Sequence, residues 1–420
     1  MDHVTFQGML TLDPIARALV AADSAAADKL GAPNYDEFQS DREVWELLRE
    51  RPFSVLRVTM PHCDVRTPED IGEEGSKATL ARAVANMARL MSDPMVKKAM
   101  HILWVYEISR PGHEGNPQIG IGGLARTSEI RTPENPQGTV IRNEGIRDVK
   151  AKGRAQLTQV THTDMGTVNL AVDDESGELR GALGGYAATH DPSFETRDEQ
   201  GNRHRVWLVS DAAEVERFRA LVAREPRAYV ADGNHRSAAA AMLGYEHYLA
   251  VVFPKSTMTI APYNRLVDVA RDQRASLASS LQRTFVLERH AGPGPLQPSR
   301  THDIGLYDGS AWWRLQPKPG TYDPNDAAQD IDADIVQHQI IEPVLGVSDA
   351  RDERIIYVGA NRDAEWLQAQ VDQGLHGCAI TLPPVTMDQF VRVCLQNKLM
   401  PPKSTWFIPK IRSGLVMAMV

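Results

Sequence analysis

RAYVADGNHRSAAAAMLG, residues Arg227–Gly244, is the stretch of this sequence that decides the fold. Its first part is a short apolar run ending at Asp232, and its second part is an alanine-rich segment of high helix propensity. The pattern predicts a strand that runs into a helix, with a turn at Gly233. Glycine permits unusual backbone angles and close approach of a ligand, Asn234 also tolerates a left-handed turn, and amides at a helix start stabilise anions.

The side chains of this turn suit phosphate chemistry. His235 and Arg236 add hydrogen-bond donors, and Arg236 is suited to a bidentate contact with a phosphate or a carboxylate. Asp232, at the end of the strand, is placed to hold a metal ion or to orient a hydroxyl. The alternative is that Asp232 only caps the helix while Arg236 pairs with a surface acid.

A second candidate for chemistry is Gly138–Glu144, a short strand that delivers Glu144 into a polar turn. Four basic residues follow it and could neutralise phosphate oxygens, although a solvated helix face explains them equally well. They are Arg147, Lys150, Lys152 and Arg154.

Two further segments carry polar groups that could contact a ligand. Lys403 stands beside two hydroxyls in Met400–Thr405, a combination able to bind an anionic group, but the segment lacks the glycines of a P-loop. A rigid proline turn before a strand is the alternative there. His162 and Asp164 would lie on one side of a strand, where a hydrogen-bonded strand end is a better explanation than a metal site.

Composition limits the classes of function. The chain has 420 residues, 42% of them hydrophobic, and a formal net charge of −9, so it lacks the concentrated basic surface of a general nucleic-acid binder. Its three cysteines have no C-x-x-C spacing, which predicts the reducing cytoplasm and no cysteine zinc site. The apolar runs are too short to span a bilayer, so no membrane role is expected.

Alternating strand and helix patterns predict an α/β (α+β) protein with mixed sheets. We expect a helix over 13–30, a strand over 54–59, and mostly loop over 111–138. Regular alternation follows over 206–267. A Gly- and Pro-rich interruption near 290–303 predicts a boundary, and strands and helices resume beyond it. The expected regions are an N-terminal region (1–137), a core carrying the Asp232 turn (138–289) and a C-terminal region (303–420).

The sequence also resembles a known family. Asp232–Arg236 resembles the A-D-G-H-H-R hallmark of the domain-of-unknown-function family numbered one thousand and fifteen. Other segments resemble that family's motifs in the same order, over nearly the whole chain. They are Pro33–Asp36, Tyr106–Glu107, Arg142–Glu144, Ala261–Arg265 and Met400–Lys410.

The short hallmark is also similar to the nucleotide-phosphate loop of free serine kinases in the partition-protein and sulfiredoxin-like superfamily. This resemblance implies a nucleotide-binding core of that type, ATP or ADP with Mg²⁺ at Asp232, and phosphoryl transfer to or from the hydroxyl of a small metabolite such as serine. The implied cofactor-binding residues are Gly233, Asn234, Arg236, Arg142 and Lys403, and the implied catalytic residues are Glu144, Asp232 and His235.

Two positions depart from the family pattern. Asn234 and Asn143 stand where the hallmark and the R-H-E motif have histidines, so two groups that could carry a proton near neutral pH are absent. A regulatory or scaffold protein that binds nucleotide without turnover is therefore an alternative. A phosphatase or a ligase that uses the same loop is another, and the oligomeric state is left open.

Overall fold

The computed structural model describes residues 9–145, 148–269, 271–350 and 352–420, and these form two compact units. Unit 1 takes in the described residues of 1–142, 146–258 and 409–420, and unit 2 takes in 143–145 and 259–408. Both units combine sheets with helices, so the predicted mixed α/β class is confirmed. No helix within the described residues is long and apolar enough to cross a membrane.

Unit 1 is built on a mixed sheet of twelve strands within the described residues, whose main path runs β5-β10-β7-β11-β4-β3-β2-β20-β6. β1 pairs with β4, and β9 joins β3 to β8. The strands are β1 (Leu12–Asp13), β2 (Ile15–Ala21), β3 (Val96–Ser109), β4 (Gln118–Arg126), β5 (Val140–Ile141), β6 (Thr163–Asp164), β7 (Val168–Val172), β8 (Phe194–Arg197), β9 (Arg203–Val209), β10 (Ala228–Asp232), β11 (His247–Pro254) and β20 (Val416–Met419).

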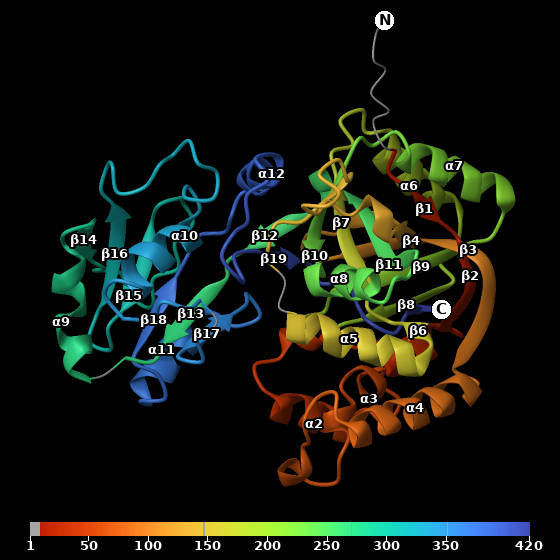
Figure 1. Ribbon diagram of the computed structural model, residues 1–420, viewed down its shortest axis with the longest axis horizontal. Coiled ribbons are helices and arrows are strands. Elements are labelled where there is room, and N and C mark those ends of the chain that lie inside the picture. Colours follow the sequence, from red (N-terminus) through yellow and green to blue (C-terminus); the bar gives the residue numbers. More distant parts are fainter. Residues whose placement is uncertain (1–8, 146–147, 270, 351) are drawn as a thin grey trace, which may run out of the picture. The chain divides into compact units, whose positions relative to one another are not determined.

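Helices cover this sheet, with α6 and α7 on one side of unit 1 and α2, α3, α4 and α5 on the opposite side (Figure 1). α8 packs on β7 and β11, and α5 packs on α8. The helices are α1 (Ser24–Leu30), α2 (Asp41–Glu50), α3 (Leu56–Thr59), α4 (Lys77–Ser92), α5 (Asp148–Thr161), α6 (Glu178–Thr189), α7 (Ala212–Val222) and α8 (Asn234–Met242). Single 3₁₀ turns are η1 (Tyr35–Glu37), η2 (Pro61–Cys63), η3 (Pro68–Asp70), η4 (Thr127–Glu129) and η5 (Lys255–Thr257).

The core of unit 1 lies between the sheet and α6 and α7. Apolar side chains of the central strands, including Leu170, Trp207, Val230 and Val252, pack there with Phe218 of α7. β10 lies between β5 and β7, and its first four residues are buried. Side chains on both faces of this strand are therefore shielded from water, which explains why its sequence is apolar. The predicted strand, turn and helix of Arg227–Gly244 are confirmed as β10, Gly233 and α8.

Unit 2 contains a six-stranded sheet of order β14-β16-β15-β18-β13-β17 and a separate pair, β12-β19, within its described residues. The strands are β12 (Thr259–Ala261), β13 (Asn264–Val267), β14 (Phe285–Arg289), β15 (Ile304–Tyr307), β16 (Trp312–Pro317), β17 (Ile355–Val358), β18 (Cys378–Thr381) and β19 (Trp406–Ile408). Its helices are α9 (Arg271–Leu281), α10 (Asp332–Val336), the π-helical η6 (Gln337–Ile341), α11 (Ala364–Asp372) and α12 (Met387–Leu395). The segment 290–303 lies inside this unit, and the three-region division of the chain remains a prediction from sequence.

Two local predictions were wrong, and a third missed a strand. The segment 13–30 is mostly strand, because β2 is held between β3 and β20, and only its last part forms α1 behind the Asp23 cap. The segment 54–59 contains helix α3, which packs on α4, in place of a strand. The segment 111–138 contains the central strand β4, whose glycines had suggested a loop; a Cβ at Gly122 would lie 2.1 Å from the Trp104 ring.

Candidate functional site

The turn at Asp232–Arg236 depends on Gly233. This residue has φ 101° and ψ 27°, in the left-handed region, and it stands immediately before α8. A Cβ at Gly233 would lie 3.1 Å from Arg236 Nε and 3.2 Å from the Cα of Val168, so a side chain would need these neighbours to give by a few tenths of an ångström, and its backbone angles would be unfavourable. The Gly233 carbonyl accepts hydrogen bonds from the Arg236 and Ser237 amides at 2.9 and 3.0 Å, which closes the first turn of α8.

Two cationic side chains converge on the Asp232 carboxylate. Arg236 Nη2 donates to Oδ1 at 2.9 Å, and Lys410 Nζ donates to Oδ2 at 2.9 Å. The exposed fractions of the three side chains are 5% for Arg236, 12% for Asp232 and 13% for Lys410, so this is a largely buried ion-pair cluster. Arg236 also donates to the Thr167 carbonyl. The alternative that Arg236 pairs with a surface acid is wrong, because its acid is Asp232 itself.

Lys410 is the residue of this cluster that the motif comparison did not single out. It belongs to the quoted segment Met400–Lys410, but Lys403 was the candidate there. Nothing local to Lys410 predicts a contact with Asp232, since 178 positions separate the two. Its place at the end of a shared motif was the available signal.

The charges of η1 complete the electrostatics of the cluster. Burial alone would lower the pKa of both Arg236 and Lys410, but Asp232 and Asp36 outweigh burial and raise both pKa values. Burial also raises the pKa of Glu37 to about 7, against the opposing charge of Lys410. The two cations therefore stay charged, while Glu37 exchanges a proton near neutral pH.

The segment Pro409–Ser413, which carries Lys410, is fixed by two other motif segments of unit 1. Asn34 Nδ2 donates to the Ile411 carbonyl at 3.0 Å, and Ser413 Oγ donates to Asn34 Oδ1 at 2.8 Å. The Arg412 amide donates to the Tyr106 hydroxyl oxygen at 3.0 Å. All three hydrogen bonds are buried, so the Pro33–Asp36 and Tyr106–Glu107 motifs contribute to holding Lys410 in place.

Behind Tyr106 lies a buried chain of polar groups. Its hydroxyl is 2.7 Å from His204 Nδ1, and His204 Nε2 is 3.2 Å from Asp198 Oδ2. Burial lowers the pKa of His204, although Asp198 acts in the opposite direction. Because every member is shielded from water, loss of one would leave a buried partner unsatisfied.

Two polar atoms beside the cluster have no hydrogen-bond partner among the described residues. They are Arg236 Nε and Asn169 Oδ1, and both are buried. Asn169 on β7 stands directly opposite Asp232 on β10, where the register of the two strands shifts. A buried guanidinium N–H without an acceptor is suited to an oxygen of a bound anion, so the donor set fits a phosphate group.

An open pocket adjoins Arg236 in unit 1, and its empty space of about 620 Å³ includes open solvent. Asp164 and Gly166 line it near Arg236, and Tyr35 and Arg154 line it from η1 and α5. The other lining residues are partly polar and partly apolar. Asp164 Oδ1 accepts from the Gly166 amide at 3.0 Å and Oδ2 from the Leu249 amide at 2.9 Å. The predicted hydrogen-bonded strand end at Asp164 is therefore confirmed.

Of the remaining candidates, Arg142 belongs to unit 1, whereas Glu144 and Lys403 belong to unit 2. Arg142 follows β5, which runs parallel to β10, and burial lowers its pKa. Glu144 forms a parallel bridge with Met400, whose amide donates to the Asn143 carbonyl at 2.9 Å.

Lys403 has φ 59°, and its Nζ lies 5.6 Å from the centroid of the Tyr263 ring. The segments Asn143–Glu144 and Met400–Lys403 are neighbours within unit 2, joined by the bridge between Glu144 and Met400. His235 lies half-buried in the first turn of α8, and Arg147 lies outside the described residues.

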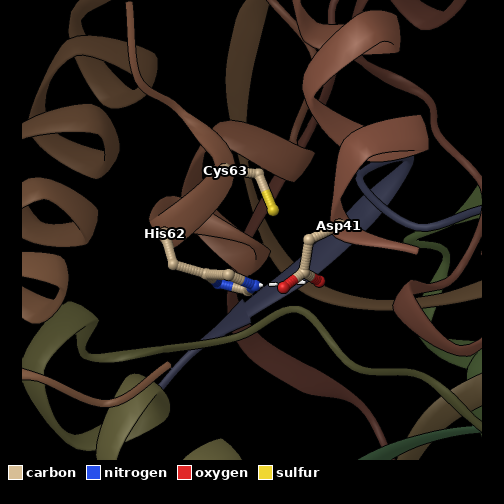
Figure 2. A group of neighbouring side chains, drawn as sticks. All are labelled: Asp41, His62 and Cys63. Atoms are coloured by element: carbon tan, nitrogen blue, oxygen red, sulfur yellow. Dashed lines mark ion pairs between the residues drawn. The ribbon is translucent and has the colours of Figure 1, made fainter. Parts of the chain in front are cut away.

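One group of three potential metal ligands occurs within the described residues. The ligand atoms of Asp41, His62 and Cys63 lie within 4.8 Å of one another, and Figure 2 shows the three side chains pointing toward a common space. His62 Nε2 is 3.3 Å from Asp41 Oδ1, and burial raises the pKa of the Cys63 thiol to about 12. Asp41 begins α2, and His62 and Cys63 belong to η2, so the group lies where these two elements meet.

Comparison with known proteins places these motifs in context. No curated protein matches the sequence significantly. Among solved structures, SbnI with a C-terminal truncation from Staphylococcus aureus matches with 10% identity and a TM-score of 0.38, covering 70% of this chain and 85% of that chain. A free serine kinase in complex with AMP matches with 12% identity and a TM-score of 0.37, covering 66% and 89%. A conserved hypothetical protein from Pyrococcus furiosus matches with 9% identity and a TM-score of 0.37, covering 66% and 92%.

At these identities and TM-scores the likeness does not extend to function. The sequence also matches a protein family: the family described as "Protein of unknown function (DUF1015)" matches residues 14–341. This span includes the Asp232 turn, the Pro33–Asp36 and Tyr106–Glu107 motifs, and Arg142–Glu144. Since it covers most of the 420 residues, the chain belongs to the DUF1015 family.

Proposed function

We propose that this protein is an enzyme of nucleotide-dependent phosphoryl transfer, to or from the hydroxyl of a small metabolite such as serine or a related hydroxy acid. The observation that carries the proposal is the convergence of Arg236 and Lys410 on Asp232, beside Gly233 and the start of α8. Buried fixed cations next to a helix N-terminus stabilise phosphate charge without reorganising during the reaction.

Each group of the turn has a role in this proposal. Gly233 allows the backbone to approach the phosphates, and the Asn234 and His235 groups at the start of α8 hold their oxygens together with Arg236. Lys410 supplies a second cation. Such a site works mainly by positioning and by neutralising charge, so it needs few covalent steps.

The proton of the metabolite hydroxyl requires an acceptor, for which we propose Glu144. Lys403 and Arg142 are proposed as further cationic contacts to the nucleotide. Glu144 and Lys403 share unit 2, where the Glu144 bridge to Met400 brings their two segments together. His235 is proposed to assist as a donor near the transferred group.

Asp232 alone is poorly suited to the proposed Mg²⁺ ion as it stands, because each of its oxygens already accepts a hydrogen bond from a cation. An ion at this carboxylate would replace Lys410 or Arg236 as its partner. When bound, Mg²⁺ would neutralise phosphate charge. The three cysteines are buried free thiols, in keeping with action in the reducing cytoplasm.

A non-catalytic nucleotide-binding regulator is the second candidate. The observation that favours it is the pair Asn143 and Asn234, both buried, at positions where histidines would have carried protons. A phosphatase or a ligase with the same loop would need the same phosphate contacts. The phosphatase and the ligase differ from the kinase in the reaction that they catalyse, and the regulator differs in catalysing none.

Calorimetric titration with ATP and ADP, with and without Mg²⁺, tests the nucleotide binding that these candidate functions share. Arg236→Ala and Lys410→Met should each lose about 1.5–3 kcal/mol of nucleotide affinity, the scale of a charged hydrogen bond, or roughly 10- to 150-fold. Arg217→Ala is the matched control, since Arg217 is an exposed residue of α7 paired with Glu214. Unchanged affinity in a folded Arg236→Ala protein would overturn the proposal.

Phosphorus NMR on mixtures of nucleotide and candidate hydroxy acids then separates enzyme from regulator. A new phosphomonoester signal that requires the metabolite is expected for the kinase. Tight nucleotide binding with no transfer to any hydroxy acid would favour the regulatory protein.

A further inference from the structure

The pocket beside Arg236 extends beyond the ion-pair cluster. Its empty space of about 620 Å³ includes open solvent, so the pocket is a groove open to solvent and not a closed cavity. The groove is lined by polar and by apolar side chains. Walls of mixed polarity suit a ligand that has an aromatic part and a hydroxylated part.

One end of the pocket is charged. Arg236 belongs both to the pocket and to the ion-pair cluster, so the pocket adjoins the place where phosphate charge would be held. Gly166 lies beside Arg236, and a Cβ there would lie 3.1 Å from Arg236 Cδ and 3.7 Å from Asp164 Oδ1. Asp164 is therefore a hydroxyl acceptor close to the cationic end. The apolar side chains of the lining include Leu157 and Leu243, and Tyr245 adds an aromatic ring.

Asp164 has acceptor capacity to spare. A carboxylate offers about four lone-pair sites, and Asp164 accepts one hydrogen bond on each oxygen, from the Gly166 and Leu249 amides. These backbone bonds also fix its orientation. A fixed carboxylate beside a phosphate site is well suited to accept hydrogen bonds from the 2′- and 3′-hydroxyls of a ribose.

Contacts of Arg154 fix another part of the lining. Its guanidinium lies over the Tyr35 ring at 4.0 Å from the centroid, and its Nη1 donates to the Thr59 carbonyl at 2.8 Å. Tyr35 is thereby fixed at the pocket without a bound ligand. Binding there costs little side-chain ordering, which favours affinity.

We propose that this pocket binds the nucleoside part of the nucleotide, with the ribose hydroxyls on Asp164 and the base among Leu157, Leu243 and Tyr245. The proposal rests on the proposed function, because it takes the phosphates to lie at Arg236. It adds a site that explains why a nucleotide would bind more tightly than its phosphates alone.

The experiment compares ADP with pyrophosphate by calorimetry. Thr158 lines the pocket from α5 and is half-buried, so Thr158→Trp fills the pocket from its rim, whereas Gln159→Trp places the same side chain on the exposed face of α5. The wild type and Gln159→Trp should bind ADP at least tenfold more tightly than pyrophosphate. Thr158→Trp should lose that advantage while its dissociation constant for pyrophosphate stays within twofold.

A second pair of variants approaches the pocket from α8. Leu243 lines the pocket, so Leu243→Trp places a large side chain there. Met242→Trp is the control, because Met242 is 46% exposed and does not line the pocket. This pair provides the test if Thr158→Trp fails to fold. In addition, ADP should bind more tightly than 2′,3′-dideoxy-ADP to the wild type, and Asp164→Asn should narrow that difference at least threefold.

The outcomes separate the two proposals. If folded Thr158→Trp and Leu243→Trp bind ADP as the wild type does, the nucleoside lies elsewhere and the pocket proposal is overturned while phosphate binding stands. If the wild type binds neither ADP nor pyrophosphate, the phosphate site fails and the pocket proposal fails with it.

Discussion

Lys410 Nζ donates a 2.9 Å hydrogen bond to Asp232 Oδ2 across 178 positions of sequence. Both residues belong to unit 1, although the chain forms most of unit 2 between them. Arg236 pairs with the other oxygen of Asp232. Two positive charges therefore face one negative charge, which leaves one positive charge unbalanced by this carboxylate. Asp36 and Glu37 of η1 add acidic charge to the same region, so a bound phosphate competes with carboxylates for the two cations.

Replacement of Gly233 by alanine should destabilise unit 1 and weaken nucleotide binding. A left-handed alanine costs roughly 1–2 kcal/mol, and the added Cβ would also press on Arg236 and on the Val168 backbone. Gly177→Ala is the matched control, since Gly177 stands before α6 with φ 70° and its Cβ would meet nothing within 4 Å. Urea unfolding should give the larger loss for Gly233→Ala, and only that variant should lose affinity for nucleotide. Equal losses in both would show that the contact with Arg236 is unimportant.

The sequence predicted this turn correctly because its determinants are local. A buried strand, a glycine and an alanine-rich helix follow one another within Arg227–Gly244, and each acts on its own neighbours. The partner Lys410 was missed because the contact is set by the return of the chain to β20 in unit 1, which no local pattern encodes.

The wrong secondary-structure predictions have the same origin. Ile15–Ala21 has the composition of a helix, yet it forms β2 because pairing with β3 and β20 outweighs propensity. Gly120, Gly122 and Gly123 resemble loop residues but lie on a central strand, where aromatic and aliphatic neighbours occupy the space of a Cβ. In both places tertiary packing decides the structure.

Glu37 should make stability depend on pH between about 4.5 and 7. Burial raises its pKa from 4.5 to about 7, so the folded state favours the protonated form. The contribution of this proton to the free energy of unfolding is fully present below pH 4.5 and is lost as the pH rises through 7. Glu37→Gln should therefore match the wild type in stability at pH 4 and exceed it by up to about 3 kcal/mol at pH 8. Urea unfolding across this range measures the difference, and parallel curves for the two proteins would contradict it.

Tyr106→Phe should weaken both the fold and the placement of Lys410. The change removes the hydroxyl that accepts from the Arg412 amide and contacts His204, leaving two buried groups unsatisfied at a cost of about 1–3 kcal/mol. We expect a loss in the free energy of unfolding and a severalfold loss of nucleotide affinity.

Tyr307→Phe provides the control for Tyr106→Phe. The Tyr307 hydroxyl donates to Asp372 at 2.6 Å in unit 2, so this variant loses a comparable hydrogen bond far from Lys410 in the chain. It should alter stability and leave nucleotide affinity unchanged. If both tyrosine variants bind nucleotide equally well, Tyr106 has no part in positioning Lys410.

The last prediction separates two carboxylates as proton acceptors. If Glu144 is the general base, Glu144→Gln keeps shape and most hydrogen bonding but removes the acceptor, so turnover should fall by roughly 10²–10⁴ while nucleotide affinity barely changes. Glu37 is the competing group, because it lies in the same unit as the Asp232 cluster and its pKa of about 7 suits a base at neutral pH. Single-turnover assays of Glu144→Gln and Glu37→Gln at pH 7.5, each at saturating nucleotide, measure the chemical step directly. A large loss in Glu144→Gln with near-normal turnover in Glu37→Gln supports the proposed assignment. The reverse pattern transfers the role to Glu37 and leaves Glu144 as a residue that joins its strand to Met400.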